Sequence, residues 1–138
     1  MVRDKTVLRL LGGTIVAALA VVATTADQNA RLAIGLLVGL PSLVLTIIGR
    51  VQLGKSFSVM PEARALVTTG LYSRLQHPMY VFLDLFLAAL IVVLGWSILI
   101  ILWGALVIAQ VIQARREEKV LAASFGADYE AYQRRTWF

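Results

Sequence analysis

The stretch HPMYVFLDLFLAALIVVLGWSILIILWGALVIAQVIQ, His77–Gln113, decides the fold. After its opening His-Pro pair it stays apolar for longer than one membrane helix needs, because about 20 residues cross the hydrocarbon core. Gly95-Trp96-Ser97 offers the one turn-forming segment near its middle. We therefore predict two transmembrane helices, over residues 79–94 and 97–113, joined as a tight hairpin.

Two further apolar segments come earlier in the chain. Residues 7–25 are interrupted only by Arg9, and residues 32–49 contain Pro41, which a membrane helix tolerates when its neighbours satisfy the freed carbonyl. Hydrophobic residues make up 59% and charged residues 15% of the chain. Soluble proteins average about 45–50% and about 25%, so this composition indicates a membrane protein.

The predicted architecture is an all-α integral membrane protein with four transmembrane helices. At 138 residues it forms a single domain, residues 1–138. A loop over residues 50–77 and a helical tail over residues 114–138 remain outside the membrane. Within the tail, Phe125-Gly126 is typical of a helix end.

The basic residues predict the orientation of these spans. Of 13 Lys and Arg, only Arg31 falls on the far side of a four-span arrangement. By the positive-inside rule the loop, the tail and both termini are cytoplasmic, in what we expect to be a bacterial inner membrane. The net charge of +5 then reflects topology, and no nucleic-acid partner is expected. Residues 1–25 could alternatively be a secretory signal, but an uncleaved first span is favoured.

The composition also limits the possible chemistry. The chain has no cysteine, which excludes disulfides, thiolate nucleophiles and cysteine-based metal sites. A single histidine and few carboxylates do not favour a transition-metal site, so no bound metal is expected.

A polar stripe opens the third span. His77, Tyr80 and Asp84 lie at positions i, i+3 and i+7 of a helix that starts at Pro78, so they share one face. An ionisable side chain in a membrane helix faces protein or water, because exposure to lipid is unfavourable. Alternatively, Asp84 forms a hydrogen bond to backbone or to a Ser or Thr on a neighbouring helix, and His77 merely marks the membrane interface.

The hairpin brings further polar side chains to this stripe. Antiparallel pairing puts residue 77 level with about residue 114. The side chains around the mouth of the His77 stripe would then be Gln113 and the charged run Arg115, Arg116, Glu117 and Glu118. Carboxylates suit an ammonium group or ribose hydroxyls, and aromatic rings suit a purine or a sulfonium. Alternatively, the charged run is only a solvated face of the helix and binds nothing. Spacing alone does not identify a reaction.

Two longer motifs resemble a known family. The segments ALVTTGLYSRLQHPMY, residues 65–80, and EEKVLAASFGADYEAY, residues 117–132, resemble the isoprenylcysteine carboxyl methyltransferase family, which is akin to the phospholipid methyltransferases. The resemblance covers about residues 54–132, with the motifs in the same order and spacing.

The resemblance implies a membrane methyltransferase that uses S-adenosyl-L-methionine, releases S-adenosyl-L-homocysteine and methylates a membrane lipid or another lipophilic small molecule at the cytoplasmic face. No residue is assigned as catalytic, because methyl transfer needs no protein nucleophile. Gln113 and Asp84 are the candidate acceptor-binding residues. By matching positions, the cofactor-binding residues would be Arg64, Ala65, Leu66, Val67, Tyr72, His77, Pro78, Met79, Tyr80, Glu117 and Glu118.

Three positions depart from the family pattern. Gln76 and Gln113 stand where the family has arginine, and Phe82 stands where a small glycine is common. The Gln113 position helps hold the acceptor carboxylate in prenylcysteine enzymes, so a different acceptor is expected here. The departures leave one alternative function, a non-catalytic four-helix membrane protein that binds lipid or another ligand. A channel with Asp84 as a relay is a weaker reading. The sequence does not indicate the oligomeric state.

Overall fold

The computed structural model describes residues 17–19, 21–54, 65–96 and 98–137, and every regular element within them is helical. Residues 17–19 and 21–25 are helical as well. The elements are α2 (Gln28–Ile34), the π-helical η1 (Gly35–Gly39), α3 (Leu40–Leu53), the 3₁₀ helix η3 (Gly70–Ser73), α4 (Pro78–Leu94) and α5 (Leu99–Arg135).

Two continuous helices are long and apolar enough to cross a membrane. They cover Gln28–Leu53, with 26 residues, and Leu99–Arg135, with 37 residues. The helix α4 is also apolar but shorter, at 17 residues. Most of the first predicted span, residues 7–25, lies outside the described residues. The protein is therefore all-helical in its described part, with two candidate membrane-spanning helices, and the count of four stays a prediction.

The hairpin turn lies at Gly95. Its backbone adopts φ 70° and ψ 16°, a left-handed conformation that glycine adopts without a steric penalty. Its N–H donates to the carbonyl oxygens of Ile91 and Val92, at 2.9 and 3.2 Å, which closes the C-terminus of α4. The next helix starts at Leu99, two residues later than predicted.

The helix that contains Pro41 differs from a regular α-helix. Its π-turn is closed by the N–H of Leu40, which donates to the carbonyl oxygen of Gly35, five residues back. Pro41 has no N–H, so the regular ladder of hydrogen bonds is interrupted here in any case. The helix continues to Leu53, so the loop that was predicted to begin at residue 50 starts four residues later.

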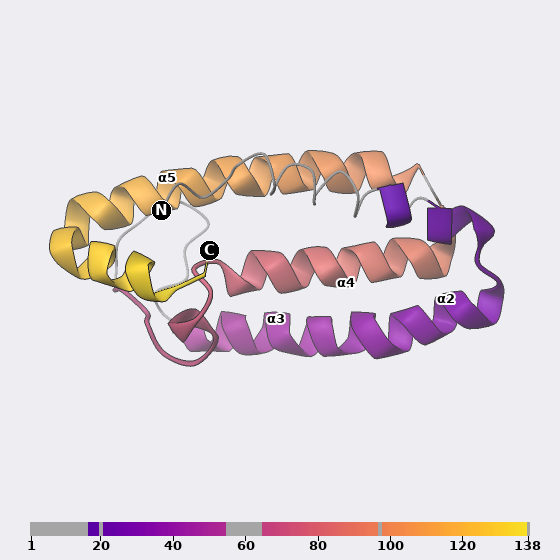
Figure 1. Cartoon of the computed structure of the whole chain (residues 1–138), viewed down its shortest axis with the longest axis horizontal. Coiled ribbons are helices and arrows are strands. Elements are labelled where there is room, and N and C mark those ends of the chain that lie inside the picture. The colour runs from indigo at the N-terminus through magenta and orange to yellow at the C-terminus, as the bar shows by residue number, and fades with distance from the viewer. Residues whose placement is uncertain (1–16, 20, 55–64, 97, 138) are drawn as a thin grey trace.

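Two glycines of η1 let this part of the helical run Gln28–Leu53 approach α4 closely. A Cβ atom added at Gly35 would collide with Val93, and one added at Gly39 would lie 3.3 Å from Ala89. Such contacts are typical of membrane helices, where packing rather than the hydrophobic effect holds helices together. In Figure 1, α4 lies between α3 on one side and α5 on the other.

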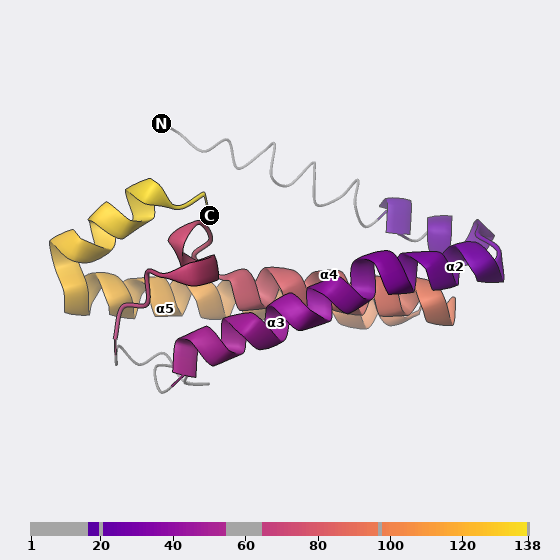
Figure 2. The same cartoon turned by 90° about the horizontal axis from the view of Figure 1, so that it is seen from below.

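The chain reverses direction at Gly126, where the sequence predicts a helix end. Gly126 has φ 48° and ψ −118°, so the helical run of α5 is kinked there. The following residues turn back toward the start of α4, as the yellow ribbon shows in Figures 1 and 2. We call residues 127–137 the C-terminal strap.

Replacing Gly95 with alanine is expected to lower the melting temperature of the protein in detergent. A left-handed backbone is unfavourable by about 1–2 kcal/mol for other residues, which corresponds to about 2–8 °C in a chain of this size. The added methyl group would also displace the guanidinium of Arg31, which packs on Gly95. Gly104→Ala is the matched control, because a Cβ there meets nothing within 4 Å. Equal melting temperatures of the two variants would contradict this reading of the turn.

Candidate functional site

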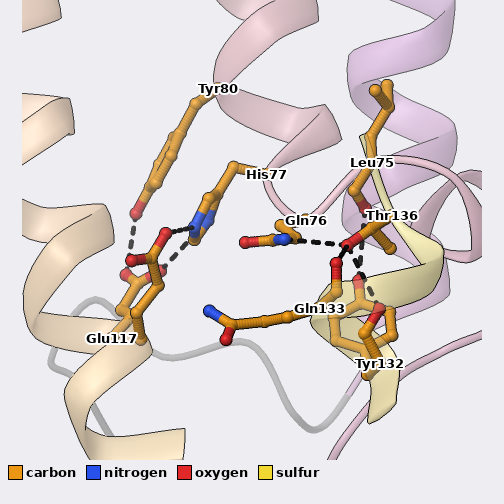
Figure 3. Close-up of polar contacts among 9 residues, drawn as sticks. Leu75, Gln76, His77, Tyr80, Glu117, Tyr132, Gln133 and Thr136 are labelled. Atoms are coloured by element: carbon orange, nitrogen blue, oxygen red, sulfur yellow. Dashed lines mark hydrogen bonds and ion pairs between the residues drawn. The ribbon is translucent and has the colours of Figure 1, made fainter. Parts of the chain in front are cut away.

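His77 lies immediately before α4 and is held there by its proline neighbour. Its backbone has φ −127° and ψ 56°, which is not helical. A residue before proline disfavours the helical region for steric reasons. Pro78 occupies the first helical turn and is fully buried. The side chain of His77 makes no capping hydrogen bond to α4. Its imidazole ring points instead toward α5 (Figure 3).

Two carboxylates of α5 face this ring. Nε2 of His77 lies 3.4 Å from Oε1 of Glu118, and Nδ1 lies 3.8 Å from Oε2 of Glu117. The side chains of His77, Glu117 and Glu118 are 18%, 23% and 36% exposed. The acidic pair and the histidine thus form one half-buried cluster, and Glu118 is its most accessible member.

Glu117 is fixed by two further donors. The hydroxyl of Tyr80 donates to its Oε1 at 2.8 Å, and the amide nitrogen of Gln113 donates to the same oxygen at 3.2 Å. The ring of Tyr80 also stacks on that of His77, with centroids 5.7 Å apart and planes 17° apart. Hydrogen bonds to a charged acceptor are stronger than neutral ones, so these donors set the orientation of the carboxylate.

The pairing of α4 with α5 differs from the predicted register by about one turn. Residue 77 was expected level with residue 114, but His77 and Tyr80 contact Glu117 and Glu118. The cause lies at the hairpin, where α5 starts at Leu99 instead of residue 97. Gln113, Glu117 and Glu118 nevertheless lie in one cluster with His77 and Tyr80, because the polar stripe on α5 extends over several turns. Arg115 and Arg116, which were also expected around His77, are exposed.

Asp84 has a partner on the neighbouring helix. With the amide of Gln110 oriented so that its nitrogen faces Asp84, that nitrogen donates to both carboxylate oxygens, at 3.1 and 2.7 Å. Gln110 is buried. The alternative named backbone or a Ser or Thr on a neighbouring helix as the partner, whereas the structure gives a glutamine side chain of α5. The role of Asp84 in binding an acceptor stays a prediction.

The C-terminal strap binds the segment that leads into His77. The amide nitrogen of Gln76 donates to the hydroxyl of Thr136 at 2.8 Å, and both residues are buried. The hydroxyl of Tyr132 donates to the carbonyl oxygen of Leu75 at 3.2 Å, and the N–H of Trp137 donates to that of Arg74 at 2.9 Å. Figure 3 shows the contacts of Gln76 with Thr136 and of Tyr132 with Leu75, beside His77. The strap therefore holds the three residues that precede the histidine.

Three tyrosines are buried near this contact: Tyr72 of η3, and Tyr129 and Tyr132 of the strap. Burial raises the pKa of Tyr72 well above its ordinary range, and Tyr132 and Glu117 add to the rise. Burial and the Glu118 carboxylate raise the pKa of Tyr129 to about 12, and burial with Tyr129 raises that of Tyr132 to about 12. All three hydroxyls are therefore protonated at pH 7, and that of Tyr132 donates to Leu75.

The remaining predicted cofactor residues lie on other segments, at position 79 of α4, or outside the described part. Ala65, Leu66 and Val67 form an irregular segment before η3. Met79 packs against Gly49 of α3. Arg64 lies outside the described residues. Their contact with a cofactor stays a prediction.

Sequence reasoning missed Gln110 and Thr136. A signal for Gln110 was present, because Gln110, Gln113 and Glu117 follow the spacing i, i+3 and i+7. Thr136 continues the same spacing from Tyr129 and Tyr132, which would have predicted a docked face on the strap.

Gln76→Leu is expected to loosen the strap without unfolding the membrane helices. A hydrogen bond between buried side chains contributes about 0.5–1.5 kcal/mol, so amide exchange over residues 127–137 should accelerate severalfold. Hydrogen exchange followed by mass spectrometry measures this. Thr136→Ser is the matched control, because it keeps the accepting hydroxyl. Unchanged exchange of the strap in Gln76→Leu would show that the bond does not hold it.

Comparison with known proteins gives one family. A family model described as phospholipid methyltransferase matches residues 30–128, which is most of the chain and includes the whole cluster of His77, Tyr80, Gln113 and the acidic pair. No curated protein and no solved structure matches the chain.

Proposed function

Because the chain belongs to the phospholipid methyltransferase family, we propose that it is a membrane enzyme that transfers the methyl group of S-adenosylmethionine to a lipophilic acceptor at the cytoplasmic face. The observation that carries the proposal is the Glu117 carboxylate, which Tyr80 and Gln113 fix beside His77 at one end of the α4–α5 hairpin. Both termini are cytoplasmic in this proposal.

The side chains of the cluster have the chemistry that this cofactor requires. The cofactor carries an ammonium group, ribose hydroxyls and a positively charged sulfonium, and when bound it supplies an electrophilic methyl group. Glu117 and Glu118 can accept hydrogen bonds from the ammonium or the hydroxyls. The stacked rings of His77 and Tyr80 offer an aromatic surface for the cation. We propose these four residues as the centre of the binding site, with Tyr72 and residues 64–67 as its further wall.

The protein contributes mainly position and the exclusion of water. In a direct transfer the acceptor forms its bond to the methyl carbon while the bond from carbon to sulfur breaks, and the electron pair stays on sulfur. No protein nucleophile is needed, so correct alignment in a water-poor site supplies most of the acceleration. Tyr80 and Gln113 restrict Glu117, and the C-terminal strap restricts the backbone that carries His77.

The acceptor in this proposal is a membrane lipid or another lipophilic small molecule. Within the family, the two motifs favour the isoprenylcysteine carboxyl methyltransferase group. A prenylated cysteine carboxylate is nevertheless not proposed as acceptor, because Gln113 is uncharged and directs its amide nitrogen to Glu117. Asp84 and Gln113 remain our candidates for contact with the polar group of the acceptor.

Calorimetric titration of S-adenosylhomocysteine into the detergent-solubilised protein tests the proposal. We expect saturable binding at one site per chain and a raised melting temperature, with adenosine monophosphate as the control ligand. Transfer of labelled methyl from S-adenosylmethionine into a bacterial lipid extract then tests the reaction. The absence of both binding and transfer would overturn the proposal in favour of a non-catalytic membrane protein that binds lipid.

A further inference from the structure

One face of α5 changes from apolar to basic along a single stripe. Residues that recur every three or four positions share a helix face. Ile101 and Ile108 on this stripe are 68% and 63% exposed, as expected for side chains that face lipid. The full stripe consists of exposed residues, Ile101, Ala105, Ile108, Ile112, Arg115 and Lys119.

The change from apolar to basic occurs at a definite depth. At a rise of 1.5 Å per residue, Arg115 lies about 24 Å and Lys119 about 30 Å along the axis from Leu99. The hydrocarbon core of a bilayer is about 30 Å thick. At the opposite end, Trp96 at the hairpin turn is 63% exposed, as is typical of a residue at the membrane interface. If Trp96 marks one interface, Arg115 and Lys119 reach the phosphate groups of the other.

The charges of this turn are separated by face. Glu117 and Glu118 point toward α4 and His77, as Figure 3 shows for Glu117. Arg115, Arg116 and Lys119 are exposed on the opposite face, and we call them the basic collar. Within the described part of the chain, none of the collar residues has an ion pair or hydrogen bond from its side chain. Three cations are therefore directed at the surroundings.

We propose that the basic collar binds the phosphate groups of anionic phospholipids in the cytoplasmic leaflet. The occupant is a lipid rather than a soluble anion, because the collar continues a stripe that faces acyl chains. Each basic side chain near the surface raises the affinity of a protein for a membrane with anionic lipid about fivefold. The same helical turn carries the acidic pair on its other face, so bound lipid would hold Glu117 and Glu118 at headgroup depth.

Native mass spectrometry of the detergent-purified protein with phosphatidylglycerol or phosphatidylcholine tests this proposal. We expect the wild-type protein to prefer phosphatidylglycerol, and the triple variant Arg115→Gln, Arg116→Gln, Lys119→Gln to bind it about a hundredfold more weakly. The matched control removes three positive charges at other positions, with Arg74→Gln, Arg134→Gln and Arg135→Gln. It should keep the preference for phosphatidylglycerol. The affinity for S-adenosylhomocysteine should not change in the collar variant, so the result is independent of the proposed methyl transfer.

Four results would overturn the proposal. The collar variant could keep the wild-type preference, or the control variant could lose it equally. Phosphatidylcholine could bind the wild type as well as phosphatidylglycerol does. Inorganic phosphate could raise the wild-type melting temperature as much as phosphatidylglycerol, which would indicate a site for free anions. If the collar variant does not fold, the wild-type protein in 1 M salt tests the proposal. The Debye length is then about 3 Å, so the preference for phosphatidylglycerol should be lost.

Discussion

Replacing Glu117 with alanine is expected to weaken the binding of S-adenosylhomocysteine at least tenfold. A charge-assisted hydrogen bond to a carboxylate contributes about 1.5–3 kcal/mol, and each 1.4 kcal/mol is a factor of ten in affinity. The substitution also removes the acceptor of Tyr80 and Gln113, which then lose the contacts that orient them. The effect should therefore exceed that of removing either donor alone.

Two variants make this experiment specific. Glu117→Gln keeps the shape of the side chain and removes its charge, so a similar loss there would assign the effect to charge. Glu130→Gln removes an exposed carboxylate on the C-terminal strap and should bind as the wild type does. Calorimetry gives the affinities, and thermal unfolding of the ligand-free proteins checks their folding. Wild-type affinity in Glu117→Ala would exclude the acidic pair from the cofactor site.

The local parts of the fold could be predicted because single residues determine them. Pro78 marks the start of α4, and Gly95 and Gly126 lie where the chain leaves a helix with positive φ. The polar stripe of α4 was recognisable for a similar reason, since ionisable residues are rare in an apolar helix. These predictions needed no knowledge of the partner helix.

The pairing between helices could not be predicted to the residue. The start of α5 depends on how many residues the turn uses, and a shift of two residues there moves every contact of the hairpin. The polar residues of both helices together predict the pairing better than the stripe on α4 alone. Asp84 and Tyr80 on α4 meet Gln110 and Glu117 on α5, so aligning both sets of polar residues gives the observed register.

The role of Gln76 shows what a comparison of motifs does not predict. The resemblance presents it as the loss of an arginine, which suggests a weakened site. In the structure it donates to Thr136, sixty residues away in the chain, and so anchors the strap. A comparison of motifs position by position does not reveal a contact that lies outside the motifs.

His77→Ala is expected to abolish methyl transfer and to weaken S-adenosylhomocysteine at least tenfold. The ring lies between two carboxylates and stacks on Tyr80, so its removal leaves Glu117 and Glu118 without the group between them. Two carboxylates that face each other without a hydrogen-bonding group between them repel, which disfavours the bound geometry of both side chains. The conservative variant His77→Gln keeps a hydrogen-bond donor and should recover part of the affinity.

The melting temperature of ligand-free His77→Ala separates this role from a structural one. A side chain that caps a helix contributes about 0.5–2 kcal/mol, and its loss would lower the melting temperature. The imidazole makes no such bond. The backbone carbonyl of His77 accepts from the N–H of Val81 at 3.2 Å, and the substitution leaves this backbone group in place. We therefore expect little change in apo stability together with the loss of binding, the opposite of Gln76→Leu, which should loosen the strap first. Unchanged affinity and activity in His77→Ala would remove the histidine from the site, and a lower melting temperature with unchanged affinity would make it a structural residue.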